Sequence, residues 1–217
     1  MHNQSGKVIF ISGIDTDIGK TVATGYYAKQ LMAQGYSVIT QKMIQTGCRH
    51  IAEDLLVHRK IQGIPLTEED RQGITCPYVF HYPCSPHLAA KLEQRAIDIK
   101  TIKNSTALLC RKYDYVLIEG AGGLFVPYNE TQTTFDYLCE QNYPLILVTS
   151  GRLGSINHTL LNLTVCRQQG IVLQAVIYNL QHSQDDIICR ETRRFLQNHL
   201  SKYFPQTEFH VLPRLIF

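Results

Sequence analysis

Three groups of polar residues, each at the end of a predicted strand, carry the side chains that could do chemistry in this 217-residue chain. The first group is segment 13–21, in which two glycines bracket a polar loop and the second is followed by Lys20 and Thr21. Backbone N–H groups of such a loop attract phosphate oxygens, the lysine adds a positive charge, and the threonine hydroxyl can bind Mg²⁺. The segment therefore predicts a phosphate-binding loop.

The spacing of this loop is unusual. Five residues separate Gly13 from the Gly19-Lys20 pair, whereas the common phosphate-loop pattern has four. The interpretation therefore depends on context: an apolar run over 7–11 predicts a buried strand before the loop, and 21–34 predicts a helix after it. The alternative is a polar turn that happens to contain Gly-Lys-Thr.

The second and third groups follow two other predicted strands. Lys42 ends the predicted strand 37–42, and Thr46 comes shortly after it. Glu119 ends the apolar run 115–118 and precedes a glycine-rich stretch, Gly120 to Gly123. Because ligands bind outside the carboxyl ends of parallel strands, we expect these side chains on the same rim as the phosphate loop. The alternatives are a solvated lysine and a tight turn.

A possible metal site combines residues from three of these segments. Glu119 is an acidic residue at the end of a predicted buried strand, which is where proteins with a phosphate-binding loop place a carboxylate near Mg²⁺. Asp54, in a predicted helix over 51–60, could reach an Mg²⁺ held by Thr21. Acidic residues in a first helical turn are also favoured by the helix dipole alone, so Asp54 by itself decides nothing.

The rest of the chain continues the alternation of strands and helices. Segment 63–86 reads as an irregular loop that ends at Ser85, a helix N-cap followed by Pro86. Further helices are predicted over 98–112, from Ser155 onward and over 187–200, and further strands over 145–148, 175–178 and 210–213. This order predicts one α/β domain, residues 1–217, with a mostly parallel sheet.

Composition excludes several classes of protein. The net charge of +3 is too small to indicate a nucleic acid or an anionic membrane surface, so we expect neither as a partner. The seven cysteines are scattered and never form a Cys-x-x-Cys pair, which indicates reduced thiols in the cytoplasm. The polar start, residues 1–6, predicts no secretion leader, and no apolar run has membrane-spanning length.

Five blocks, in order along the chain, resemble the dethiobiotin synthetase family. They are 13–21, with its extra loop residue; Lys42 with Thr46-Gly47; 84–87; 119–123; and 153–158. The resemblance implies a P-loop NTPase fold, a three-layer sandwich with helices on both faces of the sheet. It also implies a cytoplasmic homodimer that uses ATP and Mg²⁺ to close the ureido ring of dethiobiotin from 7,8-diaminononanoate and CO₂.

The resemblance also implies roles for particular residues. Lys42 would stabilise charge on the carbamate and on the transferring phosphoryl group, and Lys20 would follow the γ-phosphate; both are the implied catalytic residues. Thr21, Asp54 and Glu119 would hold Mg²⁺. The implied ATP-binding residues are Thr16, Asp17, Ile18, Gly19, Lys20, Thr21, Asp54, Glu119, Gly120, Ala121, Gly122, Asn179, Leu212, Pro213 and Arg214. Among them, Asn179 would read adenine and the segment near Pro213 would close over the base. The implied substrate-binding residues are Thr46 and, toward the neighbouring subunit, Ser155, Ile156 and Asn157.

Some residues depart from the family pattern, and other functions stay open. Asp17 and Ile14 stand where members often have glutamate and threonine, and Thr46 replaces a serine but keeps the hydroxyl. The alternatives are a divergent paralogue with another substrate, a related ATP-dependent amidoligase, and a partition-type nucleotide switch. Amidoligases carry a glutaminase domain, and the switches carry a second lysine near the loop start, where this chain has Ile14 and Asp15.

Overall fold

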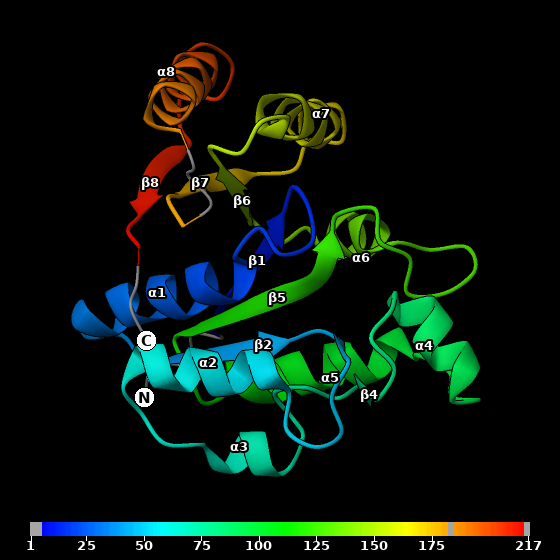
Figure 1. The fold of residues 1–217 in the computed structure, drawn as a ribbon. Coiled ribbons are helices and arrows are strands. Elements are labelled where there is room, and N and C mark those ends of the chain that lie inside the picture. Colours follow the sequence, from blue (N-terminus) through cyan, green and yellow to red (C-terminus); the bar gives the residue numbers. More distant parts are fainter. Residues whose placement is uncertain (1–5, 182–184, 215–217) are drawn as a thin grey trace.

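The computed structural model describes residues 6–181 and 185–214, and it consists of a central sheet with helices on both faces (Figure 1). The strands are β1 (Lys7–Gly13), β2 (Val38–Lys42), β3 (Gln45–Thr46), β4 (Val79–Phe80), β5 (Tyr115–Gly123), β6 (Leu145–Ser150), β7 (Leu173–Asn179) and β8 (Glu208–Leu212). The helices are α1 (Lys20–Ala33), α2 (Glu53–Gln62), α3 (Glu68–Arg71), α4 (Pro86–Leu92), α5 (Ile99–Cys110), α6 (Thr134–Gln141), α7 (Ser155–Gln168) and α8 (Asp186–Tyr203).

Six strands form the main sheet in the order β2-β5-β1-β6-β7-β8, and every pairing among them is parallel. Strand β5 lies between β2 and β1, so its end is next to the phosphate loop on one side and next to Lys42 on the other. The register pairs Lys42 with Glu119 and Ile11 with Glu119. The predicted parallel α/β sheet is therefore confirmed, and so is the shared rim.

Successive residues of β2 show which helices cover which face, because side chains alternate along a strand. Thr40 contacts His58 and Arg59 of α2, whereas Gln41 accepts a hydrogen bond from Thr106 of α5. Helix α2 therefore covers one face, together with α1, against which it packs. Helix α5 covers the other. The three layers are visible in Figure 1.

Segment 63–86 is more regular than the predicted loop. It contains α3, whose Thr67 and Asp70 form a capping box, and β4, which pairs with β3 in a separate two-stranded sheet. The four-residue helix and two-residue strand are too short for a hydrophobic period to reveal. Ser85 does occupy the N-cap of α4, but its side chain makes no capping hydrogen bond.

The glycine stretch after Glu119 belongs to a strand and does not form the tight turn that is the alternative interpretation. Strand β5 continues through Gly120 to Gly123, and the register between β1 and β5 shifts between Ile11 and Gly13. Gly122 has a φ of 65°, in the left-handed region that favours glycine.

The seven cysteines are all free thiols, and five of them are buried, as the scattered positions predict. Within the described residues, no helix combines the length and hydrophobicity needed to cross a membrane. The prediction that residues 1–6 form no secretion leader concerns mostly residues 1–5, which lie outside the described part of the chain.

Candidate active site

The phosphate loop adopts a conformation that its glycines permit. Gly19, the N-cap of α1, has a φ of 93°, in the left-handed region that favours glycine. A Cβ at Gly19 would lie 2.2 Å from Nδ2 of Asn179, and one at Gly13 would lie 2.4 Å from the Ile18 side chain. Both glycines are therefore required by close approach as well as by their place in the loop.

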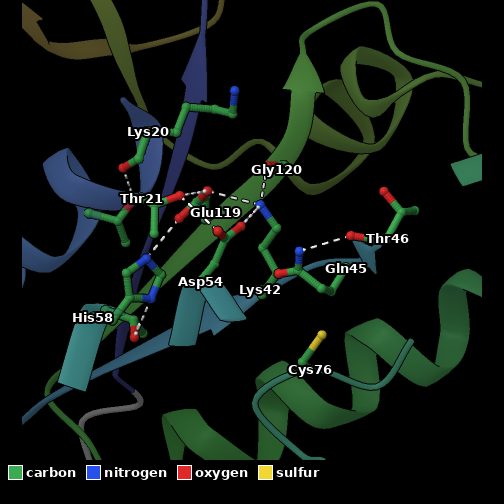
Figure 2. A network of polar contacts seen from close by, with 12 residues as sticks. Lys20, Thr21, Lys42, Gln45, Thr46, Asp54, His58, Cys76, Glu119 and Gly120 are labelled. Carbon is green, nitrogen blue, oxygen red and sulfur yellow. Dashed lines mark hydrogen bonds and ion pairs between the residues drawn. The ribbon is translucent and has the colours of Figure 1, made fainter. Parts of the chain in front are cut away.

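Four side chains meet at the carboxyl ends of β2 and β5 (Figure 2). The Lys42 ammonium lies 2.5 Å from Asp54 Oδ2 and 2.9 Å from Glu119 Oε1, and it donates to the carbonyl of Gly120 at 3.2 Å. The Thr21 hydroxyl lies 3.0 Å from Asp54 Oδ1 and 3.2 Å from Glu119 Oε1. The structure thus brings together the three predicted metal-binding residues and the predicted catalytic lysine.

The charges in this cluster hold each other in their ionised forms. Burial alone would raise the pKa of Glu119, but the Lys42 ammonium and a hydrogen bond from His58 outweigh it, so this pKa stays well below its usual range. Burial would likewise lower the pKa of Lys42, yet Glu119 and Asp54 raise it above the ordinary lysine value. At neutral pH Lys42 therefore carries a full ammonium and Glu119 a full carboxylate.

Lys20 has a different environment. Its side chain is 7% exposed, and its ammonium donates to the backbone carbonyl of Asp15 at 3.0 Å, across the loop. Burial, followed by repulsion from Lys42, lowers its pKa. In Figure 2 its amine points away from the Lys42 cluster. An anion in the loop would remove this destabilisation of the charged form.

An open cavity of about 740 Å³ lies between the phosphate loop, this cluster and the start of α4. Its size suits a drug-sized or cofactor-sized ligand. Eleven of the residues singled out from the sequence line it: Thr16, Asp17, Gly19, Lys20, Thr21, Lys42, Thr46, Asp54, Glu119, Ala121 and Gly122. Ile18 and Gly120 do not line it, but Gly120 supplies its carbonyl to Lys42.

The residues predicted to contact the base lie outside this cavity. Asn179 is buried, donates to the carbonyl of Ile18 at 2.9 Å and accepts from the backbone N–H of Gln181. It therefore stabilises the phosphate loop through Ile18. Leu212 is buried at the end of β8, while Pro213 and Arg214 are exposed. Their contacts with a base stay predictions.

The predicted substrate residues at the start of α7 also lie outside the cavity. Ser155 is fully buried, with its hydroxyl 3.2 Å from that of Ser150 and its N–H donated to the carbonyl of Arg152. Ile156 is half-buried and Asn157 is exposed. Leu153, just before this helix, is 84% exposed. The placement is compatible with a role toward a second subunit, which stays a prediction.

Two residues of the site escape prediction from the sequence. His58 of α2 is fully buried and lies 2.8 Å from Glu119 Oε2. Its spacing of four residues from Asp54 puts both on one helix face, which is the available signal. Gln45 lines the cavity beside Lys42, and its Oε1 is buried without a hydrogen-bond partner. No local pattern marks that residue.

The chain is similar to known proteins over most of its length. Residues 7–211 match a family model described as an AAA domain. The chain is 71% identical to ATP-dependent dethiobiotin synthetase BioD 2 of Pasteurella multocida, over 95% of this chain and 97% of that protein. It is 49% identical to ATP-dependent dethiobiotin synthetase BioD of Chlorobaculum tepidum, over 91% of this chain and 83% of that protein.

The chain belongs to the dethiobiotin synthetase family. Among solved structures, the ParA protein of pNOB8 bound to nonspecific DNA aligns with a TM-score of 0.56 at 15% identity, covering 98% of this chain and 87% of that one. A chain of the MinC:MinD cell division protein complex from Aquifex aeolicus aligns with 0.54 at 13% identity, over 97% and 82%. At these identities the likeness shows the P-loop NTPase fold alone.

The oxygen donors of this dethiobiotin synthetase family member fit Mg²⁺. Two carboxylates and a hydroxyl, from Asp54, Glu119 and Thr21, are hard ligands, and Mg²⁺ is commonly bound through one or two carboxylates together with phosphate oxygens and water. Within the described residues, no cluster of three or more histidine, cysteine, aspartate and glutamate side chains is arranged for a metal. Two carboxylates and a hydroxyl suit a metal that arrives with a phosphate ligand.

Proposed function

We propose that this protein closes the ureido ring of dethiobiotin from 7,8-diaminononanoate, CO₂ and ATP, releasing ADP and phosphate. The observation that carries the proposal is the combination of near full-length identity to named dethiobiotin synthetases with a cavity that joins a phosphate loop to Lys42 and Thr46. A nucleotide and a second substrate would then share one site.

The chemistry needs positive charge and close positioning. One amine of the substrate adds to CO₂ to form a carbamate. An oxygen of that carbamate attacks the γ-phosphorus of ATP, ADP leaves, and a carbamic–phosphoric anhydride results. The second amine then attacks the carbamate carbon, and phosphate leaves as the ring closes. This last step is intramolecular, so positioning supplies much of the rate. Charge on the phosphoryl group must be offset by fixed cations, for which Lys42 and Lys20 are placed.

Individual residues take the following parts in the proposal. Lys20, which donates to a loop carbonyl in the described structure, turns to the γ-phosphate when ATP binds. Lys42, fixed by Asp54 and Glu119, faces the carbamate. The Thr46 hydroxyl binds an amine or the carbamate of the substrate. Thr21, Asp54 and Glu119 would hold Mg²⁺, which would offset the negative charge of the ATP phosphates.

The assembly and location are also proposals. We propose a homodimer in which the helix start at Ser155, Ile156 and Asn157 of one subunit binds the carboxylate of the substrate held by the other. The exposed Leu153 next to it supports burial of this region on assembly. Free cysteines throughout support a reducing, cytoplasmic environment. We expect no nucleic acid or membrane as a partner.

The proposal is tested by an end-point assay. Purified protein is incubated with 7,8-diaminononanoate, bicarbonate, ATP and Mg²⁺, and dethiobiotin is measured by mass spectrometry. Reactions without ATP or without diamine are controls. We expect dethiobiotin and ADP in equal amounts. Absence of dethiobiotin under saturating substrates, with ADP binding intact, would refute the proposed substrate while leaving the nucleotide site.

A further inference from the structure

The two carboxylate oxygens of Glu119 have separate partners. Oε1 faces the cavity and contacts Lys42 at 2.9 Å and the Thr21 hydroxyl at 3.2 Å. Oε2 contacts Nε2 of His58 at 2.8 Å. Both side chains are completely buried, so bulk solvent does not compete for this contact. His58 thus holds one oxygen and directs the other toward the predicted metal and phosphate position.

The orientation of the His58 ring is set by its other nitrogen. Nδ1 lies 3.0 Å from the Thr40 hydroxyl oxygen, and that oxygen accepts a hydrogen bond from Arg59 Nη1 at 2.6 Å. Arginine can only donate, so the hydroxyl hydrogen of Thr40 is free to point at Nδ1. The Glu119 carboxylate can only accept, so Nε2 of His58 donates its N–H to Glu119.

The chain of contacts ends in a rigid ion pair. Arg59 donates through Nε and Nη2 to the two oxygens of Asp70, each at 2.8 Å, and all of these groups are buried. Asp70 in turn is fixed by the capping box of α3 and by the Thr75 hydroxyl. A continuous chain of hydrogen bonds links Arg59 through Thr40 and His58 to Glu119 (the His58 end is visible in Figure 2).

We propose that His58, oriented by Thr40 and Arg59, is a positioning residue that presents Glu119 Oε1 to the magnesium-nucleotide complex. This inference rests on the proposed nucleotide site but not on the identity of the second substrate. Groups that orient a metal ligand typically change metal affinity or activity about 10- to 100-fold when removed. His58 does not touch the cavity, so it acts only through Glu119.

The test compares ADP binding with and without Mg²⁺ by isothermal titration calorimetry. In His58→Leu we expect the Mg²⁺-dependent gain in ADP affinity to fall about 10- to 100-fold, with metal-free ADP affinity unchanged. His58→Gln keeps a donor and an acceptor on a side chain of similar length, so it should retain most of the gain. Thr40→Val keeps His58 but removes the hydroxyl that orients its ring, and its loss of the Mg²⁺-dependent gain in ADP affinity should be intermediate.

The action through Glu119 is tested by a double-mutant cycle. In a Glu119→Gln background, His58→Leu should cause no further loss of the Mg²⁺-dependent gain. The control variant is Leu196→Ala. Leu196 is fully buried in α8, at the far end of the sheet (Figure 1), so its replacement lowers stability without disturbing Glu119. The Mg²⁺-dependent gain in ADP affinity of this variant should equal that of the wild type.

Three results would overturn the inference: an unchanged Mg²⁺-dependent gain in His58→Leu, an equal loss of metal-free and Mg²⁺-dependent affinity, or additive losses in the cycle. If His58→Leu does not fold, Thr40→Val decides by the same measurement. A wild-type protein that binds ADP equally with and without Mg²⁺ would instead refute the proposed metal site. The two failures are therefore distinguishable.

Discussion

Replacing Lys42 by methionine tests the central charge cluster, because the substitution keeps most of the side-chain length and removes only the ammonium. In the structure that ammonium lies 2.5 Å from Asp54 and 2.9 Å from Glu119, with Lys42 and Glu119 buried. Without it, two carboxylates face each other, and Glu119 keeps only the hydrogen bonds from Thr21 and His58.

The size of the effect follows from this geometry. At an effective dielectric constant of about 20, two unit charges about 4 Å apart interact by roughly 4 kcal/mol, and much of that offsets desolvation of the charges. Removing one partner of a buried pair typically costs about 3–5 kcal/mol, because the other charge is left uncompensated. We expect the free energy of unfolding of metal-free Lys42→Met to fall by that amount, and turnover by about 10²–10³-fold, as for loss of a transition-state donor.

Urea denaturation in EDTA measures the first effect, and the dethiobiotin assay measures the second. ADP affinity should stay near that of the wild type, because Lys42 is assigned to the carbamate and the phosphoryl group in transfer. Lys103→Met is the matched control: this lysine pairs with Glu140 at the surface, and its loss should cost less than about 1 kcal/mol. Wild-type turnover in Lys42→Met would refute the catalytic role, and wild-type stability would refute the charge argument.

Three further predictions concern other parts of the site. Burial opposes ionisation of Asp70, but Arg59 outweighs it and lowers this pKa. The stabilisation is therefore present above the unfolded-state pKa of 3.8 and is lost as pH falls through the lower folded-state pKa. Urea denaturation near neutral pH should show Asp70→Asn less stable than the wild type by about 3–5 kcal/mol. This difference in the free energy of unfolding should disappear in acid, and a difference that is constant with pH would contradict the argument. A Cβ at Gly19 would lie 2.2 Å from Asn179, whereas one at Gly35, which has an equally positive φ, meets nothing within 4 Å. Both Gly→Ala variants should lose about 1 kcal/mol of stability from backbone strain, but only Gly19→Ala should abolish ADP binding in calorimetry. Equal ADP binding by the two variants would count against the close approach of Asn179 to Gly19. Thr46→Val should raise KM for the diamine about 10-fold through the lost hydroxyl, Thr46→Ser should restore it, and identical KM values for the two would remove Thr46 from the substrate site.

Much of the sheet and of the cluster could be predicted because each followed from a local pattern. The predicted strands 37–42 and 115–118 place Lys42 and Glu119 at a carboxyl end. The rule that such ends face the ligand then places both residues without any knowledge of the contacts. Parallel strands in neighbouring positions bring Lys42 and Glu119 into register, so two local signals become one contact.

The parts that could not be predicted depend on pairs distant in sequence. The short helix α3 is fixed by Asp70, whose partner Arg59 lies in α2, and neither residue shows this pairing in its own segment. Asn179 is predicted to read a base because its amide can donate and accept at once, and that role stays a prediction. Its hydrogen bond to the carbonyl of Ile18 in the phosphate loop joins residues 161 positions apart, so neither segment could show this contact by itself.

His58 shows the limit most clearly. A histidine in an amphipathic helix has no distinctive neighbours, and its partner Glu119 lies 61 residues further along the chain. Once the fold places α2 over β2 and β5, however, the buried ring has both nitrogens engaged, one by Thr40 and one by Glu119. Since both His58 and Glu119 are fully buried, their hydrogen bond is stronger than it would be in water, and it fixes the orientation of the Glu119 carboxylate. That orientation is the property on which a phosphate-bound Mg²⁺ would depend.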